Sequence, residues 1–206
     1  PLELHSPYVF NPGAKLKVRS GLQVDSLESE LLSDYFGSSD YDVKDLNVSP
    51  DGRMLVFAAR GPATNLKDFS WNIYTYSFTA KTIARVIAND SIANAGQDTN
   101  PSFTLTGDIV FSSNRDAGDP ATPRENIELV GELCEKVDPI EDPSLLHKMT
   151  ITGQDIIQLT YGRHNHDIST TLLEDGKIAF VRWQRSLTPA EQCNDSQSGN
   201  CALAKQ

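Results

Sequence analysis

Residues 49–57 read Ser49-Pro50-Asp51-Gly52-Arg53-Met54-Leu55-Val56-Phe57, and this stretch decides the fold because related stretches recur twice further along the chain. The counterparts are Leu105-Thr106-Gly107-Asp108-Ile109-Val110-Phe111 and Leu173-Glu174-Asp175-Gly176-Lys177-Ile178-Ala179-Phe180. Each copy contains a turn built on Gly, which permits a positive φ, and then a short apolar run that ends in Phe. Because the apolar run does not alternate with polar residues, it predicts a strand that is buried on both faces.

Further strands surround each copy of this turn. The predicted strands before the turns are Leu46–Val48, Pro101–Phe103 and Ile168–Leu172. The first two copies are followed by a second predicted hairpin, from Trp71 to Ala88 and from His147 to Thr160. Four antiparallel strands in each repeat are typical of a propeller blade. The glycines of the turns are 55 and 69 positions apart, longer than a plain blade of about 40–50 residues, so we expect insertions between the second and third strands.

The third copy is incomplete, because a polar segment without a second hairpin follows Val181-Arg182-Trp183. The sequence therefore predicts an all-β fold: a partial β-propeller of four-stranded antiparallel blades, with two complete blades and half of a third. The blades are expected at about 42–90, 98–161 and 166–206. Since propellers close with about four to eight blades, the remaining blades of a longer chain are one expected partner. A smaller open sheet with three unrelated hairpins is the alternative.

Residues 1–40 differ from this propeller region, which covers residues 41–206. Lys15–Arg19 reads as a strand, and Ser26–Phe36 predicts a short helix with Ser26 as the N-cap. Gly37–Asp40 reads as a linker. We expect this extension either to pack against a blade or to supply an outer strand that closes the ring.

The charge and the hydropathy pattern exclude two classes of function. The formal net charge is −10, and no cluster of Lys and Arg is present, so the sequence does not predict a nucleic-acid-binding face. No run of about 18 apolar residues predicts a membrane span. The chain begins at Pro1 with no positively charged region and apolar core before it, so any export signal is already absent, and we interpret the chain as processed or trimmed.

The chain contains three cysteines, Cys134, Cys193 and Cys201. Cys193 and Cys201 flank a short polar stretch, which predicts a disulfide and an oxidising compartment. Two reduced surface thiols are the alternative. Cys134 lies in the equivalent loop of the preceding blade and is the rival partner for either cysteine.

One cluster has metal-binding chemistry. His164, His166 and Asp167 combine two imidazoles with a carboxylate, and a His-x-His pair on a strand points both rings to one side. The alternative is structural, with Asp167 bonding backbone and His166 packing at the rim of the blade. A second set, Asp116, Asp119 and Glu125, offers oxygen ligands of the kind that Ca²⁺ prefers, without the EF-hand spacing. The sequence predicts no other cofactor.

Motifs for several enzyme mechanisms are missing from the sequence. It has no Gly-x-Ser-x-Gly, no His-Glu-x-x-His and no Gly-x-x-x-x-Gly-Lys. We therefore expect no catalytic activity from these residues.

The repeat resembles a known family. Ser49-Pro50-Asp51-Gly52-Arg53 with the following Leu-Val-Phe is similar to the TolB-like, WD40-like (PD40) repeat, over about residues 42–183. His166–Ser169, Leu173–Ile178 and Val181–Trp183 more narrowly resemble the propeller of hydrazine synthase alpha subunit-like proteins. That group consists of exported bacterial proteins, some of which carry c-type haem. The Cys-x-x-Cys-His motif for haem attachment is missing here.

Two functions follow as expectations. The first is a non-catalytic binding or scaffold module of a periplasmic or extracellular bacterial protein, whose insertions at 114–144 and 184–206 contact a protein or an envelope component. The second is the propeller portion of a larger enzyme, either hydrazine synthase alpha-like or a propeller-gated peptidase. Its haem-binding and catalytic residues would then lie outside this chain.

Overall fold

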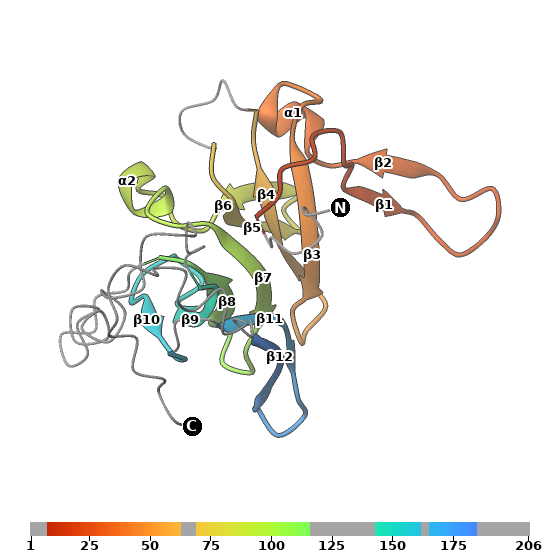
Figure 1. Cartoon of the computed structure of the whole chain (residues 1–206). Coiled ribbons are helices and arrows are strands. Elements are labelled where there is room, and N and C mark those ends of the chain that lie inside the picture. The colour runs from red at the N-terminus through yellow and green to blue at the C-terminus, as the bar shows by residue number, and fades with distance from the viewer. Residues whose placement is uncertain (1–7, 63–68, 116–142, 162–164, 185–206) are drawn as a thin grey trace, which may run out of the picture.

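The computed structural model describes residues 8–62, 69–115, 143–161 and 165–184. The described residues form two four-stranded and two two-stranded antiparallel sheets. The two four-stranded sheets and one two-stranded sheet follow one another along the propeller region (Figure 1). The first blade has the order β3-β4-β5-β6, with bounds Asp42–Val48, Met54–Arg60, Asn72–Ser77 and Thr82–Arg85. The second has β7 (Asp98–Phe103), β8 (Ile109–Ser113), β9 (Leu145–Met149) and β10 (Ile157–Gln158) in that order. β11 (Asn165–Leu172) and β12 (Ile178–Gln184) form half of a third blade, which confirms the predicted partial propeller.

The turn that identified the repeat has the same hydrogen bonds in all three copies. The amide of Gly52 donates to Ser49 O at 2.8 Å, and the amides of Gly107 and Gly176 make the equivalent bonds. The φ angles of these glycines are 71°, 85° and 84°, in the region where a side chain is strained. The tips of the three hairpins lie together in the lower part of Figure 1. The predicted role of Gly in the turns is therefore confirmed.

The main core lies between the first two blades. Strand β7 packs across β3, β4 and β5, and β11 packs across β7, β8 and β9 in the same way. Apolar residues of both sheets form this core, namely Val56, Ala58, Trp71, Ile73, Val86, Ile87, Phe103, Ile109, Phe111 and Met149. The sheets therefore cover each other's apolar faces, as expected for consecutive blades.

The apolar strand after the turn is buried in two copies and exposed in the third. The interiors of β4 and β8 are buried, as the sequence predicts. In β12, Phe180 is 38% exposed and Val181 is 55% exposed, so that prediction is wrong for the third copy. Among the described strands, β12 has only β11 as a substantial neighbour, so neither of its faces is covered as those of β8 are.

The N-terminal extension forms a hairpin rather than the predicted helix. β1 (Lys17–Arg19) pairs with β2 (Glu28–Glu30), and α1 is confined to Ser33–Phe36. Most of the predicted helix at Ser26–Phe36 is therefore wrong. Cross-strand pairing and the Lys17–Glu28 ion pair hold Glu28–Glu30 extended, against its moderate helix propensity.

This extension packs against the first blade. Leu16, Leu32 and Tyr41 form a second core with residues of β4 and β5, including Phe57 and Tyr74. Tyr41 also donates a hydrogen bond to Glu30 Oε1 at 2.7 Å. The extension thus covers the face of the first blade that points away from the second.

Candidate functional site

The first residues of β3, β7 and β11 pair with the last residues of β4, β8 and β12. These strand ends lie at one end of the blades, which we call the loop face. The end of β4, the start of β5, the end of β8 and the start of β9 lie there, whereas the tight Gly turns lie at the opposite end. Buried polar residues collect at the loop face, among them Ser70, Asn72, Asp98, Ser113, Arg115, Ser144 and Asp167. Function in a propeller is usually found in such loops, so this face is the candidate site.

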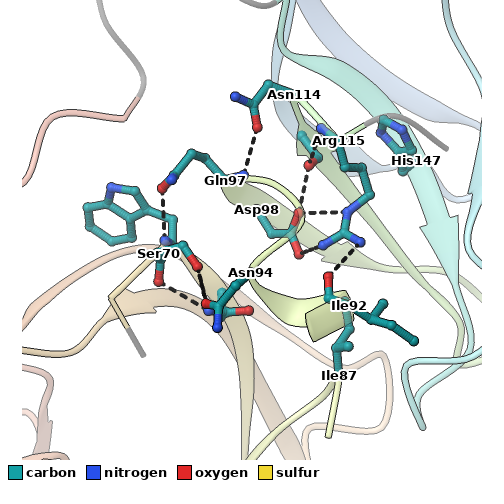
Figure 2. A network of polar contacts seen from close by, with 12 residues as sticks. Ser70, Ile87, Ile92, Asn94, Gln97, Asp98, Asn114, Arg115 and His147 are labelled. Atoms are coloured by element: carbon teal, nitrogen blue, oxygen red, sulfur yellow. Dashed lines mark hydrogen bonds and ion pairs between the residues drawn. The ribbon is translucent and has the colours of Figure 1, made fainter. Parts of the chain in front are cut away.

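An ion pair between Asp98 and Arg115 forms the centre of this face (Figure 2). Arg115 Nε donates to Asp98 Oδ1 at 3.0 Å, and Arg115 Nη2 donates to the other carboxylate oxygen. Ser113 Oγ also donates to Asp98 Oδ1, at 2.6 Å. Burial raises the pKa of Asp98, and the pairing with Arg115 and Ser113 opposes that shift. A buried carboxylate with three donors is a satisfied structural group.

The same arginine fixes the segment that links the two blades. Arg115 Nη1 donates to Ile92 O at 3.2 Å, in the short helix α2 (Asp90–Ala93). The side chain of Asn89 caps this helix by accepting from the amides of Ser91 and Ile92. Arg115 therefore holds the end of β8 to the connection between β6 and β7.

A second set of bonds ties the first blade to this centre. Trp71 N donates to Gln97 Oε1 at 3.0 Å, and Gln97 N donates to Asn114 Oδ1 at 2.7 Å (Figure 2). Ser70 Oγ donates to Asn94 Oδ1 at 2.5 Å. The start of β5, the start of β7 and the end of β8 are thus held as one rigid frame.

His147 lies beside this frame on β9 and is fully buried. Its Nδ1 lies 2.9 Å from Leu145 O, and its ring centre lies 5.6 Å from that of Phe111. The pKa of His147 is lowered to about 4, mainly by burial, so the imidazole is neutral at pH 7. Nε2 has no hydrogen-bond partner among the residues that the structure describes.

Two of the three predicted metal ligands are placed by the structure. His166 Nδ1 accepts from Ser144 N at 3.3 Å, and the ring stacks on Trp183 with centroids 5.3 Å apart. Asp167 is fully buried, and Arg182 donates to both of its carboxylate oxygens at 2.8 Å. The two side chains therefore have different cross-strand partners, as adjacent strand residues on opposite sides do.

The metal sites and the disulfide stay predictions. His164 lies outside the described residues, as do Asp116, Asp119 and Glu125, and so do Cys134, Cys193 and Cys201. The described residues contain no group of three metal-ligating side chains. The observed contacts of His166 and Asp167 are of the structural kind.

Sequence reasoning missed Asp98, Arg115 and His147. A signal for Asp98 was present, because Asp98 and Asp167 are 69 positions apart, the same spacing as Gly107 and Gly176. Each of these two aspartates pairs with an arginine of the neighbouring strand or its extension. The burial of His147 depends on packing from two sheets, which the local sequence does not reveal.

No family model and no curated protein matches this sequence. Among solved structures, one from Agrobacterium tumefaciens assigned to TolB aligns with a TM-score of 0.46 at 16% identity, over 69% of this chain and 39% of its own. TolB from Acinetobacter baumannii aligns with a TM-score of 0.44 at 20% identity, over 68% of this chain and 26% of its own.

The chain therefore spans well under half the length of either TolB structure. The resemblance of the repeats to TolB-like proteins and the nearness to hydrazine synthase stay predictions. The blade architecture itself rests on the strand order and packing described above. Among the described residues, no helix has the length and hydropathy needed to span a membrane.

Proposed function

We propose that this chain is a protein-binding module whose loop face presents the insertion between β8 and β9 to a partner. One observation supports this proposal most strongly: the residues on both sides of the insertion are buried and hydrogen-bonded. Arg115 is 5% exposed and bonded to Asp98 and Ile92, and Ser144 is fully buried. The points where the insertion leaves and rejoins the sheet are therefore fixed.

The far end of the insertion is held by the third repeat. Ser144 O accepts from Asp167 N at 2.7 Å, and Ser112 Oγ donates to Asp167 O at 2.6 Å. Ser113 and Leu145 are cross-strand neighbours, so the two ends of the insertion lie side by side. Three repeats therefore combine to position one loop.

We propose further that the parent protein is exported and that the partner belongs to the cell envelope. The predicted Cys193–Cys201 disulfide supports this assignment. The intact mass should rise by about two mass units on reduction if one disulfide is present. An unchanged mass would remove the argument for an oxidising compartment.

Site-specific photo-crosslinking tests the binding function. A photoreactive residue at Glu125, within the insertion, should give a discrete adduct with one envelope protein in cells that make the parent protein. The matched control is a photoreactive residue at Thr106, which is exposed at the opposite end of the blade. Identical adducts from both positions, or none from Glu125, would contradict the proposal.

Replacing residues 116–142 by a short Gly-Ser connection provides a second control. Because Ser113 and Leu145 are paired, a hairpin loop of about two to five residues can join these strands. The shortened protein should keep its thermal unfolding midpoint. A photoreactive residue placed elsewhere on the loop face should give an adduct in the full chain and none in the shortened protein. A shortened protein that still forms this adduct would place the binding surface outside the insertion.

A further inference from the structure

The first described residues of the chain, Tyr8–Asn11, lie on the loop face of the first blade, and we call them the N-terminal segment. The side chains that hold this segment come from the start of β3, the end of β4 and the residue before β5. The contacts run from Trp71 Nε1 to Tyr8 O at 3.0 Å, from Asn11 N to Asp42 Oδ2 at 2.7 Å, and from the Arg60 guanidinium carbon to the ring centre of Phe10 at 4.6 Å. The blade therefore contacts a carbonyl, an aromatic ring and an amide of one short segment.

Two of the residues that hold the N-terminal segment have counterparts in the other repeats. Each repeat has an aspartate near the start of its inner strand and an arginine near the end of the partner strand, namely Asp42 with Arg60, Asp98 with Arg115, and Asp167 with Arg182. The second and third of these pairs form ion pairs. Asp42 and Arg60 are cross-strand neighbours, as the residues of the third pair are, yet no ion pair of the described residues joins them.

The N-terminal segment replaces the ion pair in the first repeat. Asn11 N donates to Asp42 Oδ2, and the other carboxylate oxygen accepts from the amide of the next residue at 2.8 Å. Arg60 Nε is buried and has no hydrogen-bond partner among the described residues, whereas Arg182 Nε donates to Asp167 Oδ1 at 2.8 Å. A buried donor without an acceptor is unfavourable. The docked segment therefore holds Arg60 in a state that its counterparts do not adopt.

We propose that Asp42, Arg60 and Trp71 form a binding site for a short peptide whose third residue is aromatic and whose fourth residue offers a free amide, and that the chain's own N-terminal segment occupies this site. When the site is empty, Arg60 pairs with Asp42, so peptide binding and this ion pair exclude each other. The N-terminal segment is only partly buried, and the ion pair competes with it, so a partner peptide of the same chemistry can replace it. This inference does not rest on the function proposed for the insertion between β8 and β9.

A double-mutant cycle tests whether the peptide and the ion pair exclude each other. Asp42→Asn, Arg60→Gln and the double variant are made in the full chain and in a protein in which Gly-Ser-Gly-Ser replaces Tyr8–Asn11. The coupling of the two positions in the unfolding equilibrium constant should be less than about twofold in the full chain and at least about fivefold in the replaced protein. The same cycle at Asp167 and Arg182 is the control and should give equal coupling in both proteins. Equal coupling of Asp42 and Arg60 in both proteins would overturn the exclusion.

The single substitution Phe10→Ala tests the aromatic contact in a chain of otherwise native sequence. Hydrogen exchange of the Trp71 indole N–H, which donates to Tyr8 O, should become about two- to fivefold faster, because loss of the cation–π contact releases the N-terminal segment more often. Leu22→Ala in the exposed β1–β2 hairpin is the matched control and should leave this exchange unchanged. Equal exchange rates in the two variants would overturn the role of the aromatic ring.

Addition of a peptide to the protein with the replaced segment tests the binding site itself. The probe is the capped peptide Tyr-Val-Phe-Asn-Pro, and the control peptide has Ala in place of Phe. Because a short tether gives an effective concentration in the millimolar range, a segment that docks within the chain should also bind as a free peptide at about 1 mM. The probe should shift the indole N–H NMR signal of Trp71 saturably and leave that of Trp183 unchanged, and the control peptide should bind at least about threefold more weakly. No shift at Trp71, or equal binding of both peptides, would overturn the proposed site.

Discussion

Phe111 and Phe180 occupy the same position in consecutive repeats and have opposite environments. Phe111 is fully buried between two sheets, whereas Phe180 is 38% exposed on the last described strand. The two ends of the molecule show the same contrast, because the N-terminal extension covers the outer face of the first blade and no described segment covers β12. The burial of a repeat position is therefore set by its neighbours and not by the repeat itself.

The largest expected effect comes from truncating these two phenylalanines. Phe111→Ala should lower the free energy of unfolding by about 3–5 kcal/mol, because it leaves a cavity between the blades. Phe180→Ala, the matched change at the exposed position, should cost less than about 1 kcal/mol. Denaturant titration of both variants measures the difference. Equal losses would mean that Phe180 is covered as Phe111 is.

The buried ion pair at the loop face should contribute more to the free energy of unfolding than the exposed ion pair of the third repeat. Arg115→Met leaves the buried carboxylate of Asp98 without its partner and should cost about 3–5 kcal/mol. Lys177→Met removes an ion pair with Asp175 whose side chains are 76% and 53% exposed, and should change stability by less than about 0.5 kcal/mol. Thermal unfolding distinguishes the two. A small loss for Arg115→Met would contradict the rigid frame at the loop face.

The buried His147 predicts that the stability of the protein depends on pH. Burial is the main cause that lowers its folded pKa to about 4 from its ordinary value of 6.5, so the unfolded state binds a proton first as the pH falls. Stability should therefore decline from about pH 6.5 to about pH 4 and then level off, with a total loss of about 3 kcal/mol from this group. Unfolding curves at several pH values should show a shallower decline for His147→Gln. The same decline in both proteins would assign the effect to other groups.

The smallest expected difference concerns two turn glycines with positive φ. Gly107→Ala should lower the free energy of unfolding by about 1 kcal/mol, because a φ of 85° strains a residue that has a side chain. The loss should not be larger, since nothing lies within 4 Å of an added Cβ. Gly153→Ala should cost more, since an added Cβ would lie 2.4 Å from Val86 O in the preceding blade. Urea unfolding of the pair measures both losses. A Gly153 variant as stable as the Gly107 variant would argue against close contact between the blades at this turn.

The local part of the fold could be predicted from the sequence. Gly52, Gly107 and Gly176 mark the turns because the required backbone conformation favours glycine, and the strands beside them followed from short apolar runs. The helix predicted at Ser26–Phe36 failed because strand pairing with Lys17–Arg19 overrides local propensity. The exposure of β12 also depends on contacts between sheets that no local pattern encodes.

Less of the candidate site could be predicted. His166 and Asp167 attracted attention as residue types, yet their partners, Ser144 and Arg182, come from other positions along the chain. The Asp98–Arg115 pair joins the two ends of one hairpin, and Arg115 also donates to Ile92 O in α2. Residue types suggested where chemistry could occur, but contacts distant in sequence determine what these side chains do.

Amide hydrogen exchange at Phe103 tests most directly whether the first two blades lie face to face. Phe103 N donates to Asn47 Oδ1 of the first blade at 3.1 Å, so its protection depends on contact between the sheets. We expect slow exchange in the unmodified protein and faster exchange in Asn47→Ala, with no change at Thr104, whose amide bonds to Asp108 O within its own hairpin. Rapid exchange at Phe103 in the folded protein, or no response to Asn47→Ala, would contradict the stacked-blade structure.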